Sequence, residues 1–94
     1  MAEDPPEVTE ILRRFLKDGR LGAIPAKAAK RRVILDHLAQ MFEPGHRYPE
    51  AEVNALLGRV HPDTAALRRY LVDEGFMARA DGVYWRAGGT LEVD

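Results

Sequence analysis

The chain has 94 residues, of which 46% are hydrophobic and 31% charged, a length and composition typical of one globular domain. It contains no cysteine, which excludes disulfides, thiolate metal sites and cysteine nucleophiles and favours a reducing compartment. The formal net charge is −1, whereas a domain that binds DNA is usually basic. Residues 1–10 lack the basic and apolar regions of a signal peptide, and no apolar run reaches a membrane-spanning length. We therefore expect a soluble, cytoplasmic protein.

The beginning of the chain predicts an acidic, flexible tail followed by an amphipathic helix. The tail comprises residues 1–6 and ends at a Pro-Pro pair. Gly19 is a suitable end for the helix, and residues 21–25 form either a docking strand or an extended link. Four apolar residues follow the i, i+3, i+4, i+7 spacing of the helix: Val8, Ile11, Leu12 and Phe15.

A second helix is predicted over residues 26–42, and it begins with three cations, Lys27, Lys30 and Arg31. Cations at a helix N-terminus oppose the helix dipole, so their placement favours a role other than stability. A solvated helix face is the more common explanation of such charges. Residues 13–32 hold eight basic residues and one acidic residue, so a basic patch is compatible with the near-neutral chain.

The second half of the chain predicts a short strand, two helices and a β-hairpin. Pro49 forces Tyr48 towards an extended conformation and opens a third helix over residues 49–60. The fourth helix is predicted over residues 63–74, with Leu67 among its inward-facing residues.

The hairpin is predicted from strands 76–79 and 83–86, which flank an Asp-Gly turn at residues 81–82. Tyr84 and Trp85 are adjacent in one strand and point to opposite faces, so one of them belongs to the core. We expect Trp85 to be half-buried. A stacking role for either ring is the less common outcome.

These elements predict an α+β fold, a winged helix-turn-helix with an additional N-terminal helix and a C-terminal β-hairpin wing. The single winged-helix-like domain is expected over residues 7–87, followed by a flexible tail over residues 88–94. Because the same outline also serves in protein-binding modules, the fold alone does not decide the function.

Several short motifs occur in a characteristic order. They are Asp18-Gly19-Arg20-Leu21, Ile24-Pro25, Lys27, Lys30-Arg31, Phe42-Glu43-Pro44-Gly45, Tyr48-Pro49-Glu50, Glu52-Val53-Asn54, Leu57, His61, Asp63, Leu67-Arg68-Arg69, Leu71-Val72-Asp73 and Tyr84-Trp85. In this order they resemble the bacterial family catalogued as domain of unknown function 2087, over about Phe15 to Arg86. Pro49 departs from the small or acidic residue that the family has before Glu50. Relatives of this kind occur alone and beside helix-turn-helix regulatory domains, which implies a role in transcription, although the family has no established activity.

The fourth helix carries the leading candidates for contact with DNA. It would enter the major groove, where Arg68, on the same face as Thr64, reads a base or clamps a phosphate with Arg69 at its flank. The alternative is that Arg69 pairs with Asp73 and that Arg68 pairs with a carboxylate of the second or third helix, which would fix the helix packing. The full set of candidate DNA-binding residues is Thr64, Arg68, Arg69, Arg79, Arg86, Lys27, Lys30 and Arg31.

Five members of this set would contact phosphates around the groove. Arg79 and Arg86 lie on the two arms of the predicted wing, although single solvated arginines are the commoner case. Lys27, Lys30 and Arg31 would join them from the second helix. The basic residues of the first two helices support DNA binding if they share a face with Arg68.

The sequence contains no arrangement of residues typical of an enzyme. His37, His46 and His61 lack metal-ligand spacing, and His61 is expected to cap or pack. No Ser/His/Asp order, P-loop or dinucleotide-binding glycine pattern occurs. We expect no catalytic residue, cofactor or metal.

Two functions follow from this interpretation. The first is binding of double-stranded DNA in bacterial transcriptional regulation. The second is a protein–protein interaction module on a winged-helix scaffold without DNA binding, either as a homodimer formed through the first helix or with a partner regulatory protein.

Overall fold

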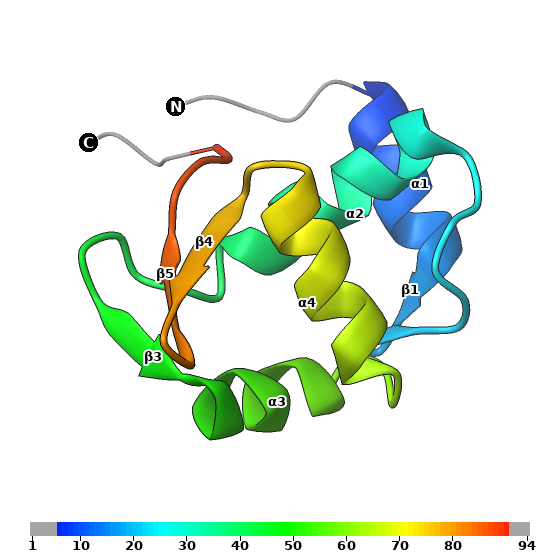
Figure 1. The fold of residues 1–94 in the computed structure, drawn as a ribbon. Coiled ribbons are helices and arrows are strands. Elements are labelled where there is room, and N and C mark those ends of the chain that lie inside the picture. The colour runs from blue at the N-terminus through cyan, green and yellow to red at the C-terminus, as the bar shows by residue number, and fades with distance from the viewer. Residues whose placement is uncertain (1–5, 91–94) are drawn as a thin grey trace.

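In the computed structural model, which describes residues 6–90, the chain forms four helices and two small antiparallel sheets (Figure 1). The helices are α1 (Pro6–Phe15), α2 (Ala28–Ala39), α3 (Glu50–Gly58) and α4 (Thr64–Asp73). The first sheet pairs β1 (Leu16–Lys17) with β2 (Arg20–Leu21). The second contains β3 (Arg47–Pro49), β4 (Met77–Ala80) and β5 (Val83–Arg86), in the order β3-β5-β4.

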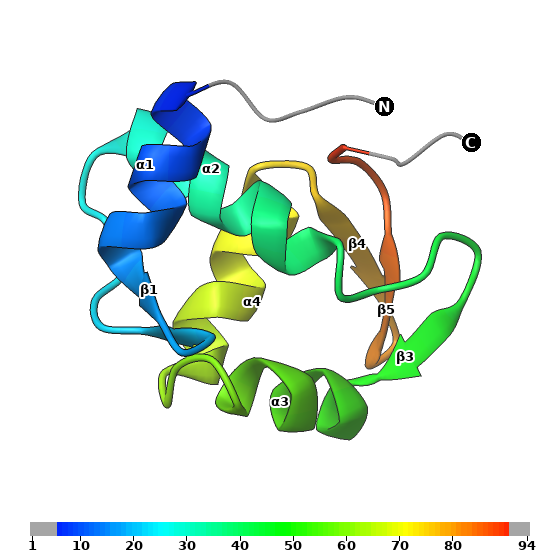
Figure 2. The same cartoon turned by 180° about the vertical axis from the view of Figure 1, so that it is seen from behind.

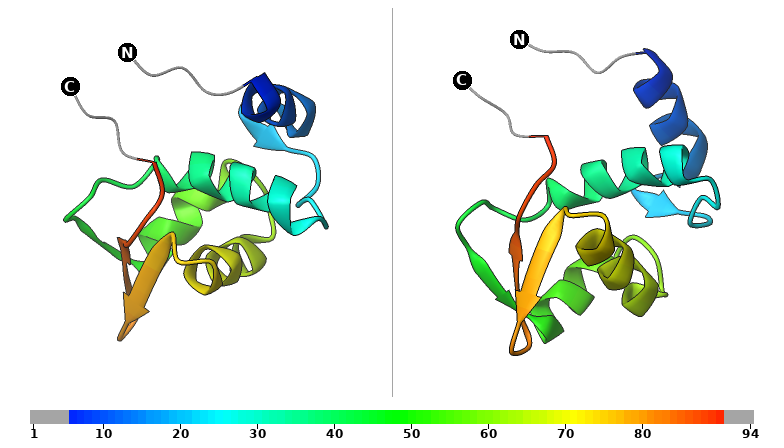
Figure 3. Two further views of the ribbon diagram at one scale, coloured as in Figure 1. Left: turned by 90° about the horizontal axis from the view of Figure 1, so that it is seen from above. Right: turned by 45° about the horizontal axis from the view of Figure 1, so that its top comes forward.

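The three-stranded sheet and α1 lie at opposite ends of the molecule. Figures 1 and 2 show α2, α3 and α4 between these two ends, and Figure 3 shows α2 running from beside α1 towards the sheet. The last three predicted helices and the C-terminal hairpin are confirmed, with ends that differ by at most three residues from the predicted ones, and the strand at residues 83–86 matches its prediction. No helix within residues 6–90 combines the length and apolar character needed to cross a bilayer.

A single core joins the apolar faces of α2, α3 and α4 to the inner face of the sheet. Tyr84 is buried in this core, whereas Trp85 on the other face of β5 is half-buried beneath the guanidinium of Arg47, as predicted for the pair. Burial of apolar surface is the main driving force of folding, so these contacts fix the helix positions. The residues of this core cluster are Leu21, Ile34, Leu35, Leu38, Ala39, Phe42, Tyr48, Val53, Leu57, Val60, Leu67, Leu71, Phe76, Met77 and Tyr84.

The structure differs from the prediction after α1, which ends at Phe15 and leads into a small hairpin, β1-β2, instead of continuing to Gly19. Asp18 and Gly19 form its two-residue turn with φ values of 53° and 76°, the left-handed pair that tight hairpins require. The amide of Leu21 donates to the carbonyl of Val60 at 2.8 Å, which anchors the hairpin to the turn after α3. Residues 21–25 therefore begin as a strand and continue as an irregular link.

Pro49 does not open the third helix. It is the last residue of β3, with an extended backbone at φ −59° and ψ 149°, and α3 begins at Glu50. The amide of Glu50 donates to the carbonyl of Gly82 at 3.0 Å, so the start of the helix is tied to the hairpin turn.

Contacts of the fold continue past residue 87, where the prediction placed the end of the domain. The amide and the hydroxyl of Thr90 donate to the carboxylate of Asp36 at 2.6 and 2.8 Å. Of the predicted tails, residues 1–5 and 91–94 lie outside the described part of the chain, and Pro6 belongs to α1.

A substitution of Leu67 tests the predicted inward face of α4, because this side chain is completely buried. We expect Leu67→Ala to lower the free energy of unfolding by about 2–5 kcal/mol, the cost of a cavity in a packed core. Urea denaturation measures this, with the exposed Arg69→Ala as a control on the same helix expected within about 0.5 kcal/mol of wild type. A loss below about 1 kcal/mol for Leu67→Ala would contradict the assigned face.

Candidate nucleic-acid interface

A pocket of about 170 Å³ lies between α4 and the β4-β5 hairpin and brings three of the predicted arginines together. Its lining residues are Ala65, Arg68, Arg69, Val72, Asp73, Arg79 and Tyr84. The helix is fixed at its start by Asp63, whose carboxylate accepts from the amide of Ala66 at 3.1 Å. Arg68 and Arg69 therefore leave a rigid element instead of a loop.

The register of the hairpin places Arg79 at this pocket. Arg79 is directly opposite Tyr84 in the β4-β5 pair, and opposed residues point to the same face of a sheet. That face is the one that covers the core, but Arg79 lies beyond the core and is exposed, with its guanidinium 5.9 Å from the Tyr84 ring centroid. The strand pairing therefore directs a cation from the hairpin towards α4.

Arg68 has a structural role within this site. Its Nη1 donates to Glu50 Oε1 at 2.8 Å and to the hydroxyl oxygen of Tyr84 at 3.2 Å, and that hydroxyl donates to the same Glu50 oxygen at 3.1 Å. The Arg68 side chain is 19% exposed. This is the predicted alternative in which Arg68 pairs with a carboxylate of the third helix.

One donor of Arg68 has no acceptor among these contacts. Its Nε is buried and has no hydrogen-bond partner within the described part of the chain. A buried donor without an acceptor costs about 1–3 kcal/mol, which reduces the net stabilisation that Arg68 contributes.

The charge of the pocket is close to balanced, with a small excess of cations. Arg68, Arg69 and Arg79 stand against the carboxylates of Asp73 and Glu50. Arg69 is exposed, and no ion pair joins it to Asp73 in residues 6–90, so the predicted alternative for Arg69 is not formed. Thr64 is half-buried and does not line the pocket.

Arg31 makes contacts inside the fold, and its contact with a phosphate stays a prediction. Its Nε donates to Glu74 Oε2 at 3.1 Å, its Nη1 donates to the carbonyl of Ala26 at 2.9 Å, and its guanidinium lies 4.5 Å from the Tyr70 ring centroid. The side chain is 17% exposed. Arg31 therefore holds the start of α2 against α4, and Arg32 adds a second contact to Glu74 at 3.2 Å.

Arg86 is likewise used internally. It donates to the carbonyls of Gly88 at 3.1 Å and Phe42 at 3.4 Å, and to the carbonyl of Thr90. These bonds hold the segment after β5 beside the turn that follows α2. Three of the five N–H donors of Arg86 are therefore engaged within the fold, and its contact with a phosphate stays a prediction.

Lys27 and Lys30 belong to a different surface. Both lie at the start of α2, which is at the α1 end of the molecule and away from the β4-β5 hairpin (Figures 1 and 3). The basic residues of the first two helices and Arg68 therefore do not share a face. The predicted set divides into a cluster of Arg68, Arg69 and Arg79 and a separate pair of lysines.

Two residues of the site were missed by sequence reasoning, Glu50 and Tyr84 in their role as partners of Arg68. They lie 18 and 16 residues from Arg68 in the chain, and no local spacing marks them as neighbours. His61 uses its Nδ1 to accept from the amide of Asp63 at 3.0 Å, which confirms its predicted role in the turn before α4.

Comparison with known proteins adds one positive finding. The sequence model of a family described as "uncharacterized protein conserved in bacteria (DUF2087)" matches residues 20–86. The match spans most of the chain and contains the whole pocket, whereas α1 and β1 precede it. No curated protein and no solved structure matches the chain.

The ion pair of Arg68 is tested by a double-mutant cycle with Glu50. We expect Arg68→Ala to lower the free energy of unfolding by about 1–3 kcal/mol, because it removes hydrogen bonds that join α4 to α3 and β5. Glu50 is 45% exposed, so the coupling energy between Arg68→Ala and Glu50→Ala should be only about 0.5–1.5 kcal/mol. Additive losses in urea denaturation would show that the pair contributes nothing.

Proposed function

We propose that this chain, which belongs to the bacterial family DUF2087, contains a winged-helix domain that binds the backbone of double-stranded DNA in transcriptional regulation. The order α2-β3-α3-α4-β4-β5 and the sheet order β3-β5-β4 agree with a winged helix, in which α4 is the helix placed at the groove and β4-β5 is the wing.

The observation that carries this proposal is the meeting of three arginines at the pocket between α4 and the wing. Arginine pairs with phosphate through two parallel hydrogen bonds, which fix orientation as well as contribute energy. Arg69 and Arg79 are exposed and come from the two elements that would flank a DNA strand.

The same geometry argues for backbone contacts over base reading. Arg68 is held by Glu50 and Tyr84, so it is not free to reach a base edge. Contacts to phosphate position a protein on the duplex without reading sequence. With few phosphate contacts and a net charge of −1, the binding would be weak in one copy and sensitive to salt.

A protein–protein interaction module on the same scaffold is the second candidate function. It is favoured by α1, whose apolar stripe is only half-buried although it packs against α2. Under this alternative a second copy or a regulatory partner covers α1, and the arginine pocket contributes to solubility. Salt-dependent DNA binding separates the two candidates.

The DNA proposal predicts that removing the exposed arginines of the pocket makes DNA binding less dependent on salt. The double substitution Arg69→Ala/Arg79→Ala should weaken binding to all duplexes alike and reduce the slope of log K against log salt concentration by about 2, since each phosphate contact contributes about 0.9. Fluorescence anisotropy with labelled duplexes at several salt concentrations measures this slope.

Lys27→Ala/Lys30→Ala is the matched control, because it removes the same charge from the other end of the molecule. Its slope should stay near that of wild type. If the lysine pair lowers the slope and the arginine pair does not, the DNA surface lies at the start of α2. If the intact protein shows no salt-sensitive binding, the interaction module is the better function.

A further inference from the structure

Helix α1 has a partly uncovered apolar face. Its stripe packs against α2, yet every apolar side chain of the stripe stays half-buried: Val8, Ile11, Leu12 and Phe15. The helix also lies before the residues that match the family, so the matched fold contains its own core without α1. An amphipathic helix added at the edge of a complete core exposes an apolar face that a partner can cover.

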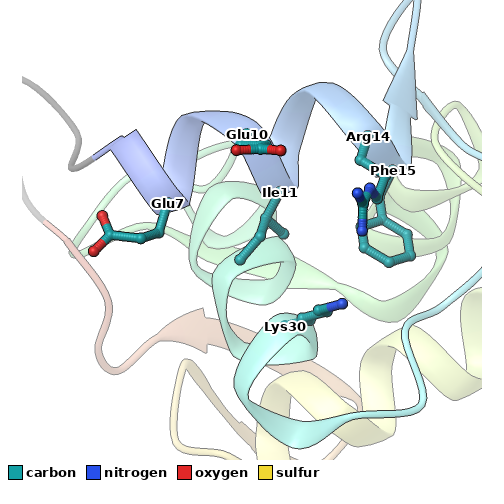
Figure 4. A pocket seen from close by; sticks show the side chains of 6 residues that line it. All are labelled: Glu7, Glu10, Ile11, Arg14, Phe15 and Lys30. Carbon is teal, nitrogen blue, oxygen red and sulfur yellow. The ribbon is translucent and has the colours of Figure 1, made fainter.

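A groove of about 180 Å³ lies along the junction of α1 and α2, beside the incompletely buried stripe (Figure 4). Its floor is apolar, and charged side chains of opposite sign lie towards its two ends. Figure 4 shows Glu7 and Arg14 at opposite ends of α1, with Lys30 across the groove on α2. The lining residues are Glu7, Glu10, Ile11, Arg14, Phe15 and Lys30.

The charges of the groove have no partners inside the described chain. Glu7, Glu10 and Arg14 are exposed, and within residues 6–90 no ion pair involves them or Lys30. The two acids precede the apolar residue Ile11 and the basic residue follows it. The groove is therefore acidic at one end and basic at the other.

We infer that this groove binds α1 of a second copy of the chain in an antiparallel orientation. Glu7 and Arg14 are seven residues apart, about two helical turns, so they lie on the same side of α1 about 10.5 Å apart along its axis. A two-fold axis between Glu10 and Ile11 brings Glu7 of each copy to Arg14 of the other. A parallel arrangement would place like charges together.

Self-complementarity is what identifies a second copy as the occupant. A two-fold interface uses the same patch on both subunits, so each acidic end must meet a basic end. The acid–apolar–base order of α1 satisfies this condition within ten residues. Ile11 lies next to the two-fold axis and supplies the apolar contact, whereas the exposed ion pairs add little affinity and set the orientation. A contact confined to one short helix is small, so the dimer should be weak.

Sedimentation equilibrium without DNA tests this inference at concentrations from about 10 μM to about 1 mM, the range suited to a small interface. Wild type should show a monomer–dimer equilibrium. Glu7→Arg and Arg14→Glu should each raise the dissociation constant about tenfold, because each change turns two attractive contacts into two repulsive ones. The double variant Glu7→Arg/Arg14→Glu should return to within about threefold of wild type.

Glu52→Arg is the matched control, since it makes the same charge change at an exposed position of α3. It should dimerise as wild type does, and circular dichroism should show that all variants retain their helices. A monomer at every concentration, or no recovery in the double variant, would overturn the inference. Because DNA is absent, the outcome is independent of the proposed DNA binding.

Discussion

The contact of Arg68 with Glu50 and Tyr84 is the interaction on which the candidate site depends. A charge that is 19% exposed must have partners, because its desolvation would otherwise outweigh the packing gained by its side chain. The partners come from α3 and β5, so one guanidinium sets the position of α4 against both. The pairing of β4 with β5 then places Arg79 opposite Tyr84, so its guanidinium reaches the same pocket as Arg68.

The arginines of this protein divide into those that hold the fold together and those that face solvent. Arg31 and Arg86 satisfy backbone carbonyls at places where the chain leaves regular structure, beside α2 and after β5. A planar group with five donors suits this task, since it can reach several acceptors at once. Their charges are therefore poor indicators of a binding surface, and an inference from the number of basic residues overstates what a partner can contact.

The sequence predicted the elements that carry strong periodicity and left out those that are too short to show any. The Asp-Gly turn at residues 81–82 was recognised because four-residue strands flank it. The same dipeptide at residues 18–19 makes a turn with nearly the same φ values, but its strands have two residues each and show no alternation. The hairpin is fixed instead by tertiary contact, in which Leu21 is buried and bonded to Val60.

The candidate site was also only partly predictable from the sequence. Helix periodicity places Arg68 and Arg69 outside the innermost stripe of α4, and the hairpin turn places Arg79 on a strand. Neither pattern tells which acid neutralises Arg68, because Glu50 reaches it only through the packing of α3 on α4. The sequence allowed the pairing of Arg68 with a carboxylate as one alternative, and only the three-dimensional arrangement shows that Glu50 is the partner.

The near-neutral net charge of the chain connects the proposed DNA binding with the proposed dimer. One copy with a net charge of −1 and one arginine pocket releases few counterions from DNA, so a single domain gains little affinity from electrostatics. Joining two copies through α1 would leave both pockets uncovered, since α1 and the β4-β5 hairpin lie at opposite ends of the fold (Figure 1). The second pocket would then act at a raised effective concentration, provided that both reach the same duplex. Dimerisation of this kind would supply affinity that the near-neutral composition of one chain cannot provide.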